Sequence, residues 1–465
     1  MSITPFSILL IIIYIRLIIL RDVKKQFLIS FVIAMICSIS IYMGYFVKFS
    51  EGGEVSYSTI SWLACTFFAN RLNISKHIGA WDAGKVAKKI LLYLFCLAFS
   101  TLLFFIYRYD KPVVEGSDYT NFMLNTVGYA HLTNSSIKFG WIYASLMLCY
   151  VLRVAYKKLC LHDILYIGER FIKYTTIMIL VGYLEFFTEN LFDSLFVTNS
   201  AVTFFGKSGA QQIMITYDRG WSNIQVFTKE ASMFSTSLLY SVIIAVNMVI
   251  LQGKKKKYLY YIGASMLLMV INRSMSSYVY VFLLVVYITY LRPFSTIKHG
   301  TNPKIAFWLL FVIVLVLSSQ TLLMSDSYLS NRLNESITQL SGFRDESFTN
   351  TSEGLRYFGM YHCLSIFADR PLFGVGLGCI ACVSGVITLL SNIGLLGLCS
   401  YVALVSPSIR GISRLDSILL MLLVVIAPNL LLNDLNTMFA LIIPFAALLT
   451  AFSIKYKNNL IYDYE

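Results

Sequence analysis

Charge is what this chain has little of. Only 13% of its 465 residues are charged, whereas 57% are hydrophobic. A soluble protein carries about 25% charged residues, so the composition excludes an ordinary soluble protein and leaves no room for a separate soluble domain.

Three further absences narrow the function. The net charge of +13 is not accompanied by a basic face with interleaved aromatic residues, so we expect no nucleic acid partner. No internal repeat of the kind that builds inverted-repeat transporters is visible. Cys379 and Cys382 have a Cys-x-x-Cys spacing without a second pair or a nearby histidine. We therefore interpret them as helix residues and predict no metal or other cofactor.

Hydrophobic runs recur from end to end, many of them close to the ~20 residues that cross a bilayer. Backbone groups cannot stay unpaired in lipid, so such spans must be helices. The sequence thus predicts an all-α, polytopic integral membrane protein in which residues 1–465 form a single transmembrane domain with about 12–13 transmembrane helices. The predicted spans are 4–20, 27–47, 55–70, 90–107, 139–152, 174–190, 231–251, 258–272, 276–291, 305–323, 373–405 (with a break near Ser384-Gly385), 416–432 and 436–453.

The basic residues are concentrated in alternate connections between these spans. The clusters are Arg21/Lys24/Lys25, Arg71 to Lys89, Arg153/Lys157/Lys158, Lys254 to Lys257, Arg292/Lys298/Lys304, Arg410/Arg414 and Lys455/Lys457. The positive-inside rule makes them cytoplasmic. The loops 108–138, 191–230 and 324–372 then face outward, and the last is a single large late loop.

The outward loops nevertheless contain arginines, which the positive-inside rule does not predict. Arg219, Arg273, Arg356 and Arg370 are the main ones, with Arg344 as a weaker candidate. They either form ordinary salt bridges with the acidic residues of the same loops or bind an anionic ligand. The sequence leaves both interpretations open.

The late loop has the most informative segment. Arg356 begins a predicted short amphipathic helix that contains His362 and ends at Asp369-Arg370-Pro371, because a proline stops a helix at or before the preceding residue. Gly374, Gly376 and Gly378 follow. Exposed N–H groups at a helix start bind anions, and glycines let a ligand approach the backbone. Alternatively, the glycines only allow close helix packing.

Two other segments reach the same predicted membrane face. The stretch from Arg219 to Glu230 runs directly into the span at 231–251, and Glu230 is either a helix cap or a general base. Asn272-Arg273-Ser274 forms a very short outer turn between two spans. A charge held this close to lipid is costly unless it is paired, which makes Arg273 a functional candidate.

Together these segments resemble the O-antigen polymerase and ligase superfamily, the Wzy and WaaL type membrane proteins. That family reads Arg-x-x-Gly…Glu-Pro-Ser, then Ser-Arg-Ser, then Arg…Pro-x-x-Gly-x-Gly-x-Gly. The matches here are Arg219-Gly220, Glu230-Ala231-Ser232, Asn272-Arg273-Ser274, Arg356 and Pro371-Leu-Phe-Gly-Val-Gly-Leu-Gly378. Ala231 replaces the family's proline, and Arg219 and Gly220 are adjacent. No His-Asn pair follows the glycines, which favours polymerase over ligase.

The resemblance implies a metal-independent glycosyltransferase in the bacterial inner membrane, with its active site facing the periplasm. It would transfer a growing glycan from undecaprenyl pyrophosphate onto an incoming lipid-linked repeat unit. Its partners would be these lipid-linked oligosaccharides, the bilayer and a chain-length regulator in the same membrane. The O-antigen ligase and a flippase or transporter are the alternatives.

The expected roles of the residues follow from the same resemblance. Glu230 and His362 are the candidate catalytic residues. The pyrophosphate would be bound by the arginines and glycines of the three segments: Arg219, Arg273, Arg356, Arg370, Gly374, Gly376 and Gly378.

Overall fold

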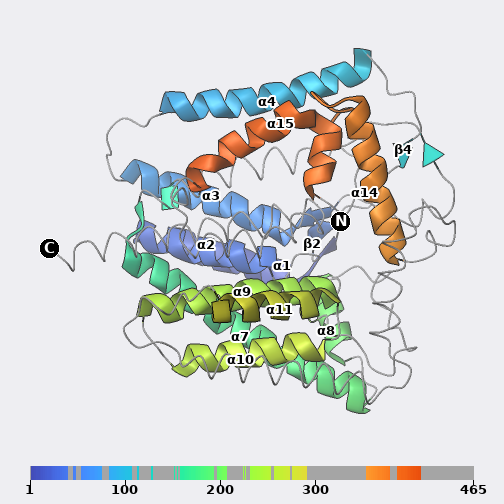
Figure 1. Ribbon diagram of the computed structural model, residues 1–465. Coiled ribbons are helices and arrows are strands. Elements are labelled where there is room, and N and C mark those ends of the chain that lie inside the picture. The colour runs from blue at the N-terminus through green and yellow to red at the C-terminus, as the bar shows by residue number, and fades with distance from the viewer. Residues whose placement is uncertain are drawn as a thin grey trace, which may run out of the picture.

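A computed structural model gives the three-dimensional structure of the chain. It describes residues 2–39, 45–48, 54–75, 83–106, 113–114, 127–128, 151, 154–155, 158–192, 196–206, 224, 226, 231–252, 256–272, 275–290, 352–377 and 385–409. Over these residues the protein is mostly helical (Figure 1). The helices are α1 (Pro5–Ile19), α2 (Val23–Ile39), α3 (Tyr57–Ser75), α4 (Ala83–Ile106), α7 (Leu161–Phe192), α8 (Phe196–Phe205), α9 (Ala231–Gln252), α10 (Lys256–Ile271), α11 (Met275–Tyr290), α14 (Ser352–Asp369) and α15 (Gly385–Ile409).

The described strands are short and pair only with their sequence neighbours. β1 (Ser2–Ile3), β2 (Tyr45–Lys48) and β3 (Glu54–Ser56) form an antiparallel sheet, and β4 (Val113–Val114) pairs with β5 (Val127–Gly128). β1 leads into α1, whose first turn is capped by Thr4: its hydroxyl accepts the N–H of Ser7 at 3.1 Å, and Pro5 follows the cap. Proline suits this position because the N–H it lacks would have no helical partner.

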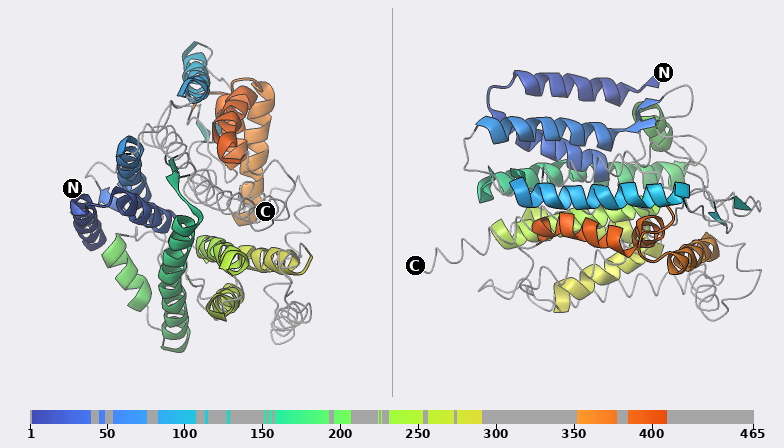
Figure 2. Two further views of the ribbon diagram at one scale, coloured as in Figure 1. Left: turned by 90° about the vertical axis from the view of Figure 1, so that its left-hand side faces the viewer. Right: turned by 90° about the horizontal axis from the view of Figure 1, so that it is seen from above.

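Helix α9 forms the centre of the structure. Every residue from Phe234 to Val249 is buried. A helix that is apolar on all sides needs such surroundings. α7, α10 and α11 pack against it, and Figure 2 shows the helices lying side by side in a bundle.

The outer helices expose large apolar side chains to their surroundings. Ile12 and Ile15 of α1 are 56% and 54% exposed, and Phe105 of α4 is 70% exposed. Within the part of the chain that the structure describes, three helical segments are long and apolar enough to cross a membrane: Lys88–Ile106, Leu161–Glu189 and Val386–Ala403. Pro5–Ile19 and Phe234–Val249 are shorter apolar helices of the same kind. Apolar surface on this scale needs a partner other than water.

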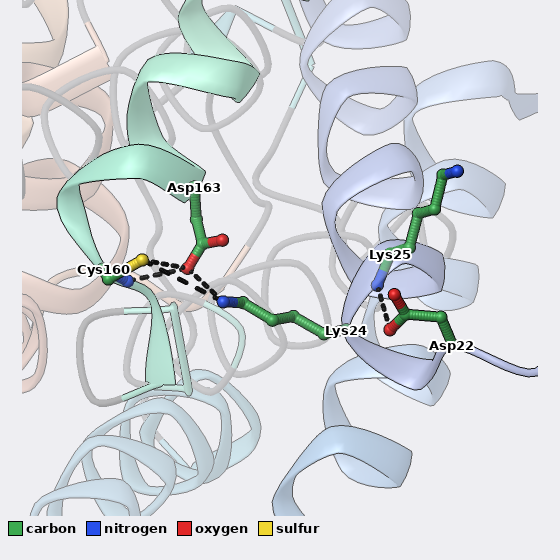
Figure 3. Close-up of polar contacts among 5 residues, drawn as sticks. All are labelled: Asp22, Lys24, Lys25, Cys160 and Asp163. Carbon is green, nitrogen blue, oxygen red and sulfur yellow. Dashed lines mark hydrogen bonds and ion pairs between the residues drawn. The ribbon is translucent and has the colours of Figure 1, made fainter.

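Basic residues connect helix ends on one side of the bundle, which we call the basic end. The Lys24 ammonium at the start of α2 lies 2.7 Å from the Asp163 carboxylate at the start of α7, and Asp163 also accepts from the Cys160 backbone N–H at 2.8 Å (Figure 3). This carboxylate raises the pKa of Lys24. Lys257 at the start of α10 pairs with Glu169 of α7 at 3.3 Å. The described basic residues of three predicted cytoplasmic clusters therefore lie at or beside helix starts at this end: Lys24 and Lys25, Lys158, and Lys256 and Lys257.

The opposite side, which we call the sheet end, contains the β1–β3 sheet, α8 and α14 (Figure 1). There the Tyr57 hydroxyl at the start of α3 donates to the Phe205 carbonyl at 3.2 Å and also contacts the Thr4 hydroxyl. These bonds tie the ends of α3 and α8 to the beginning of the chain.

Most predicted spans that fall on described residues coincide with helices, with differences at their ends. Residues 45–47, predicted to continue a helix, form part of β2, and the predicted outer loop 191–230 contains α8. Residues 373–377, predicted to begin the span 373–405, form a turn, and α15 is broken at Gly394. The predicted break near Ser384-Gly385 falls next to residues 378–384, which lie outside the described residues, and stays a prediction. The predicted spans 305–323, 416–432 and 436–453, and most of 139–152, lie outside the described residues.

Candidate functional site

Helix α14 occupies part of the predicted late loop and ends where the sequence predicts. The Arg370 N–H donates to the Ile366 carbonyl at 3.2 Å and the Phe367 carbonyl at 3.1 Å, and Pro371 then prevents further helix. Cys363 and Ile366 are buried, whereas Tyr361 is 64% exposed. The helix therefore has an inward and an outward side, as an interfacial helix needs.

Three sequence-predicted site residues lie along α14. Arg356 lies near its beginning, the half-buried His362 near its middle, and the half-buried Arg370 directly after its last residue. At about 1.5 Å rise per residue, Arg356 and Arg370 are about 21 Å apart along the axis, and His362 lies between them. The two arginines therefore cannot bind the same phosphate group.

After Arg370 the chain turns and docks into a break in α15, an arrangement we call the turn–break interlock (residues 371–376 against 391–396). The Val375 and Gly376 N–H groups donate to the Ser391 and Asn392 carbonyls at 2.9 and 3.0 Å. In return, the Leu395 and Leu396 N–H groups donate to the Pro371 and Leu372 carbonyls at 2.8 and 3.2 Å. In an unbroken helix the carbonyls of 391 and 392 would accept from the N–H groups of 395 and 396. The turn thus pairs all four groups that the break releases.

Glycine is required on both sides of the interlock. Gly374 has a φ of 68°, and a Cβ there would lie 2.4 Å from the Asn392 carbonyl carbon. Gly394 has a φ of 67° and a ψ of −173°, and a Cβ would lie 2.3 Å from the Leu372 carbonyl carbon. This φ/ψ combination is essentially restricted to glycine.

The interlock corrects one sequence-based expectation. We expected the N–H groups near Gly374 and Gly376 to be exposed to an anion. Instead, Gly374 N–H donates to the Arg370 carbonyl at 3.0 Å, and Gly376 N–H donates to Asn392. Both glycines are buried. The structure instead shows these two glycines in the role of the alternative interpretation, in which they allow two backbone segments to pack closely. Gly378 lies outside the described residues.

A second group of contacts surrounds residues 224 and 226, which lie between Arg219 and Glu230 in the sequence. Asn272 is fully buried at the end of α10, and its side-chain oxygen accepts the Ile224 N–H at 2.8 Å. Its side-chain nitrogen donates to the Ser235 hydroxyl of α9 at 2.9 Å, and Ser235 also contacts Ser277 of α11. The structure therefore brings the second and third predicted segments together.

Glu185 of α7 completes this group, and the sequence did not indicate it. Its carboxyl group does not reach the surface, because the residue is only 1% exposed. Instead, its Oε2 accepts the Val226 N–H at 2.6 Å. Val226 has a φ of 49°, which for a β-branched residue costs about 1–3 kcal/mol. A buried carboxyl group in an apolar helix was the available signal.

The remaining predicted site residues are not part of the described structure. Arg219, Glu230 and Arg273 lie outside it, and of Arg356 only the backbone is described. Within the described ranges, no three His, Cys, Asp or Glu side chains are close enough together to share a metal ion.

Comparisons with known proteins add no relative. The chain matches no protein-family model, and no curated protein is similar to it in sequence.

Proposed function

We propose that this chain is a polytopic protein of the bacterial inner membrane that polymerises O-antigen or a related surface polysaccharide at the periplasmic face. It transfers a growing glycan from undecaprenyl pyrophosphate onto an incoming lipid-linked repeat unit. The exposed apolar side chains of α1 and α4 and the three long apolar helices support the membrane location. The basic end is the cytoplasmic side by the positive-inside rule, and the sheet end is the periplasmic side.

A single observation carries the enzymatic part of the proposal. Arg370 lies on the predicted periplasmic side, directly between α14 and the turn–break interlock, whose backbone positions are fixed by four hydrogen bonds. A guanidinium at a fixed place near the membrane boundary suits a lipid-linked phosphate, to which arginine donates two parallel hydrogen bonds.

The reaction needs charge stabilisation more than any other form of catalysis. A hydroxyl of the acceptor sugar attacks the anomeric carbon of the donor glycan, and the bond from that carbon to the pyrophosphate oxygen breaks. The proton of the hydroxyl passes to a base, for which Glu230 is the first candidate and His362 the second. The pyrophosphate leaves with its additional negative charge, and arginines placed against it stabilise that charge.

The distance between the two arginines along α14 favours a separate binding role for each of them. Both substrates carry a pyrophosphate, and the about 21 Å between Arg356 and Arg370 is too long for one phosphate group but suits two. We therefore assign the two arginines to different lipid carriers. His362 lies between them along the helix.

The first test is a lipopolysaccharide gel from the host with this gene deleted, complemented by wild type or by Arg370→Ala. We expect single-repeat core without a ladder in the deletion strain and in the variant at matched membrane expression. A normal ladder in the deletion strain refutes the polymerase. Loss of the single repeat together with accumulated lipid-linked polymer supports the ligase instead, and loss without polymer supports the flippase.

A further inference from the structure

Glu185 is an ionisable group in an apolar helix, and the proposed reaction gives it no task. It lies in the segment Leu161–Glu189, which is long and apolar enough to cross a membrane, and it is only 1% exposed. Ionisable residues are rare in such helices because burying their charge is costly, and those that occur are generally paired and functional. Its position facing the 224–226 backbone indicates what it does.

Two buried side chains from different helices hold this short piece of backbone at positions two residues apart. Asn272 of α10 accepts the N–H of Ile224 at 2.8 Å, and Glu185 of α7 accepts the N–H of Val226 at 2.6 Å. Ile224 and Val226 are themselves 1% exposed. Neither N–H belongs to a described helix or strand, and a buried N–H without an acceptor would be strongly unfavourable. The segment therefore depends on these two side chains.

The backbone conformation shows that the segment is held against its own preference. Val226 has a φ of 49°, a region that β-branched residues avoid. Gly182, one turn before Glu185 on α7, faces the same place: a Cβ there would lie 2.8 Å from Leu268 Cδ2 and at an ordinary contact distance, 3.4 Å, from Val226 Cγ2. A strained residue persists only when its surroundings determine its conformation.

We propose that Glu185 and Asn272 are positioning residues that hold residues 224–226 and thereby align two periplasmic segments of the active site. Arg219 precedes Ile224 by five residues and Glu230 follows Val226 by four, while Arg273 is bonded directly to Asn272. Asn272 also donates to Ser235, five residues after Glu230. The same two side chains therefore fix the backbone at positions a few residues away from Arg219, Glu230 and Arg273. This inference rests on the proposed function.

The experiment uses the full-length protein in nanodiscs and two independent measurements. Hydrogen exchange of the peptide containing residues 224–226 reports the hydrogen bonds themselves, and elongation of a lipid-linked repeat unit gives kcat and KM. We expect Glu185→Ala to speed exchange at Val226 about two- to tenfold, as the loss of one hydrogen bond of ordinary net strength implies. We expect kcat to fall by about 100-fold, because small misplacements of reacting groups have effects of this size.

The variants separate positioning from general damage. Glu185→Gln keeps a carbonyl acceptor for the Val226 N–H and should restore most of the kcat and the exchange protection. Glu185→Ala and Asn272→Ala act on the same segment, so their effects on kcat should be less than additive in the double variant. Glu189→Gln, one turn along the same helix and only half-buried, is the matched control and should behave as wild type.

Each outcome decides one of the two ideas. Unchanged exchange in Glu185→Ala overturns the proposed support of residues 224–226, whatever the activity. Faster exchange with unchanged kcat overturns its role in positioning the active site. A wild-type protein that elongates nothing in this assay refutes the polymerase, while the exchange comparison still decides whether Glu185 holds the segment.

Discussion

Replacing Gly394 by alanine should destabilise the protein strongly, although the substitution adds only one methyl group. The φ/ψ region of Gly394 costs a residue with a side chain about 1–3 kcal/mol. The new Cβ would also lie 2.3 Å from the Leu372 carbonyl carbon and 2.4 Å from the Phe373 nitrogen, both backbone atoms that cannot rotate away. The turn must therefore move and weaken the four hydrogen bonds of the interlock. If two of them are lost at about 0.5–1.5 kcal/mol each, the total destabilisation is about 2–6 kcal/mol.

The unfolding temperature of the purified protein in nanodiscs measures this effect, with a thiol-reactive dye as reporter. Cys37, Cys65, Cys96 and Cys363 are buried free cysteines that react only when the structure opens. Gly263→Ala is the matched control, because nothing lies within 4 Å of a Cβ at that helical position. It should leave the midpoint unchanged or raise it, since alanine favours helix by about 0.5–1 kcal/mol. The same midpoint for both variants would show that the interlock contributes no stability.

The remaining predictions concern single charges. Arg370→Ala should reduce the rate of elongation by about 100-fold or more, because it removes a hydrogen-bond donor to the charge that develops on the leaving group. Arg370→Lys should recover only part of that rate, because lysine lacks the planar pair of donors. Equal rates for lysine and arginine would exclude bidentate binding. Lys24→Met should lower the free energy of unfolding at neutral pH by no more than about 1 kcal/mol, since Lys24 is partly exposed, and the unfolding midpoint should fall accordingly. The pKa of Lys24 is raised in the folded state, so its contribution is complete below its unfolded pKa and is lost as the pH rises through the folded value. The difference from wild type should therefore be present at about pH 8 and shrink only at a pH above the ordinary lysine pKa of about 10.4. Lys25→Met is the control, because the Lys25 side chain points away from Asp163 (Figure 3), and a difference that grows with pH would contradict the assignment.

The sequence predicted correctly those helices and helix ends that are determined by neighbouring residues in the chain. The spans 231–251, 258–272 and 276–291 correspond closely to α9, α10 and α11, because each is a continuous apolar run bounded by polar residues. The end of α14 at Asp369 followed from Pro371 alone.

Features that depend on residues far apart in the chain could not be predicted. The Gly-x-Gly pattern at 374–376 indicated a tight turn, but nothing in it showed that Gly394 would break α15 to receive that turn. Glu185 was visible only as an unexpected charge in an apolar run. Its hydrogen bond to Val226, 41 residues away in the chain, depends on how α7 and α9 pack against each other. Hydrophobicity identifies spans, whereas contacts between their ends depend on their arrangement.

The interlock also determines which groups near α14 remain available to a substrate. Breaking α15 within an apolar region releases the Ser391 and Asn392 carbonyls, and an unpaired carbonyl there costs more than a typical hydrogen bond contributes. The N–H groups of the turn are therefore used for these carbonyls, and the Ser100 hydroxyl of α4 adds a further bond to Asn392 at 2.7 Å. An anion near the turn would then be bound by the Arg370 side chain rather than by the glycine backbone. The two roles predict different failures: Arg370→Ala should fold normally and lose elongation, whereas Gly374→Ala should lose elongation because it unfolds. If Gly374→Ala kept wild-type stability but lost elongation, the glycine backbone itself would have to contact the substrate.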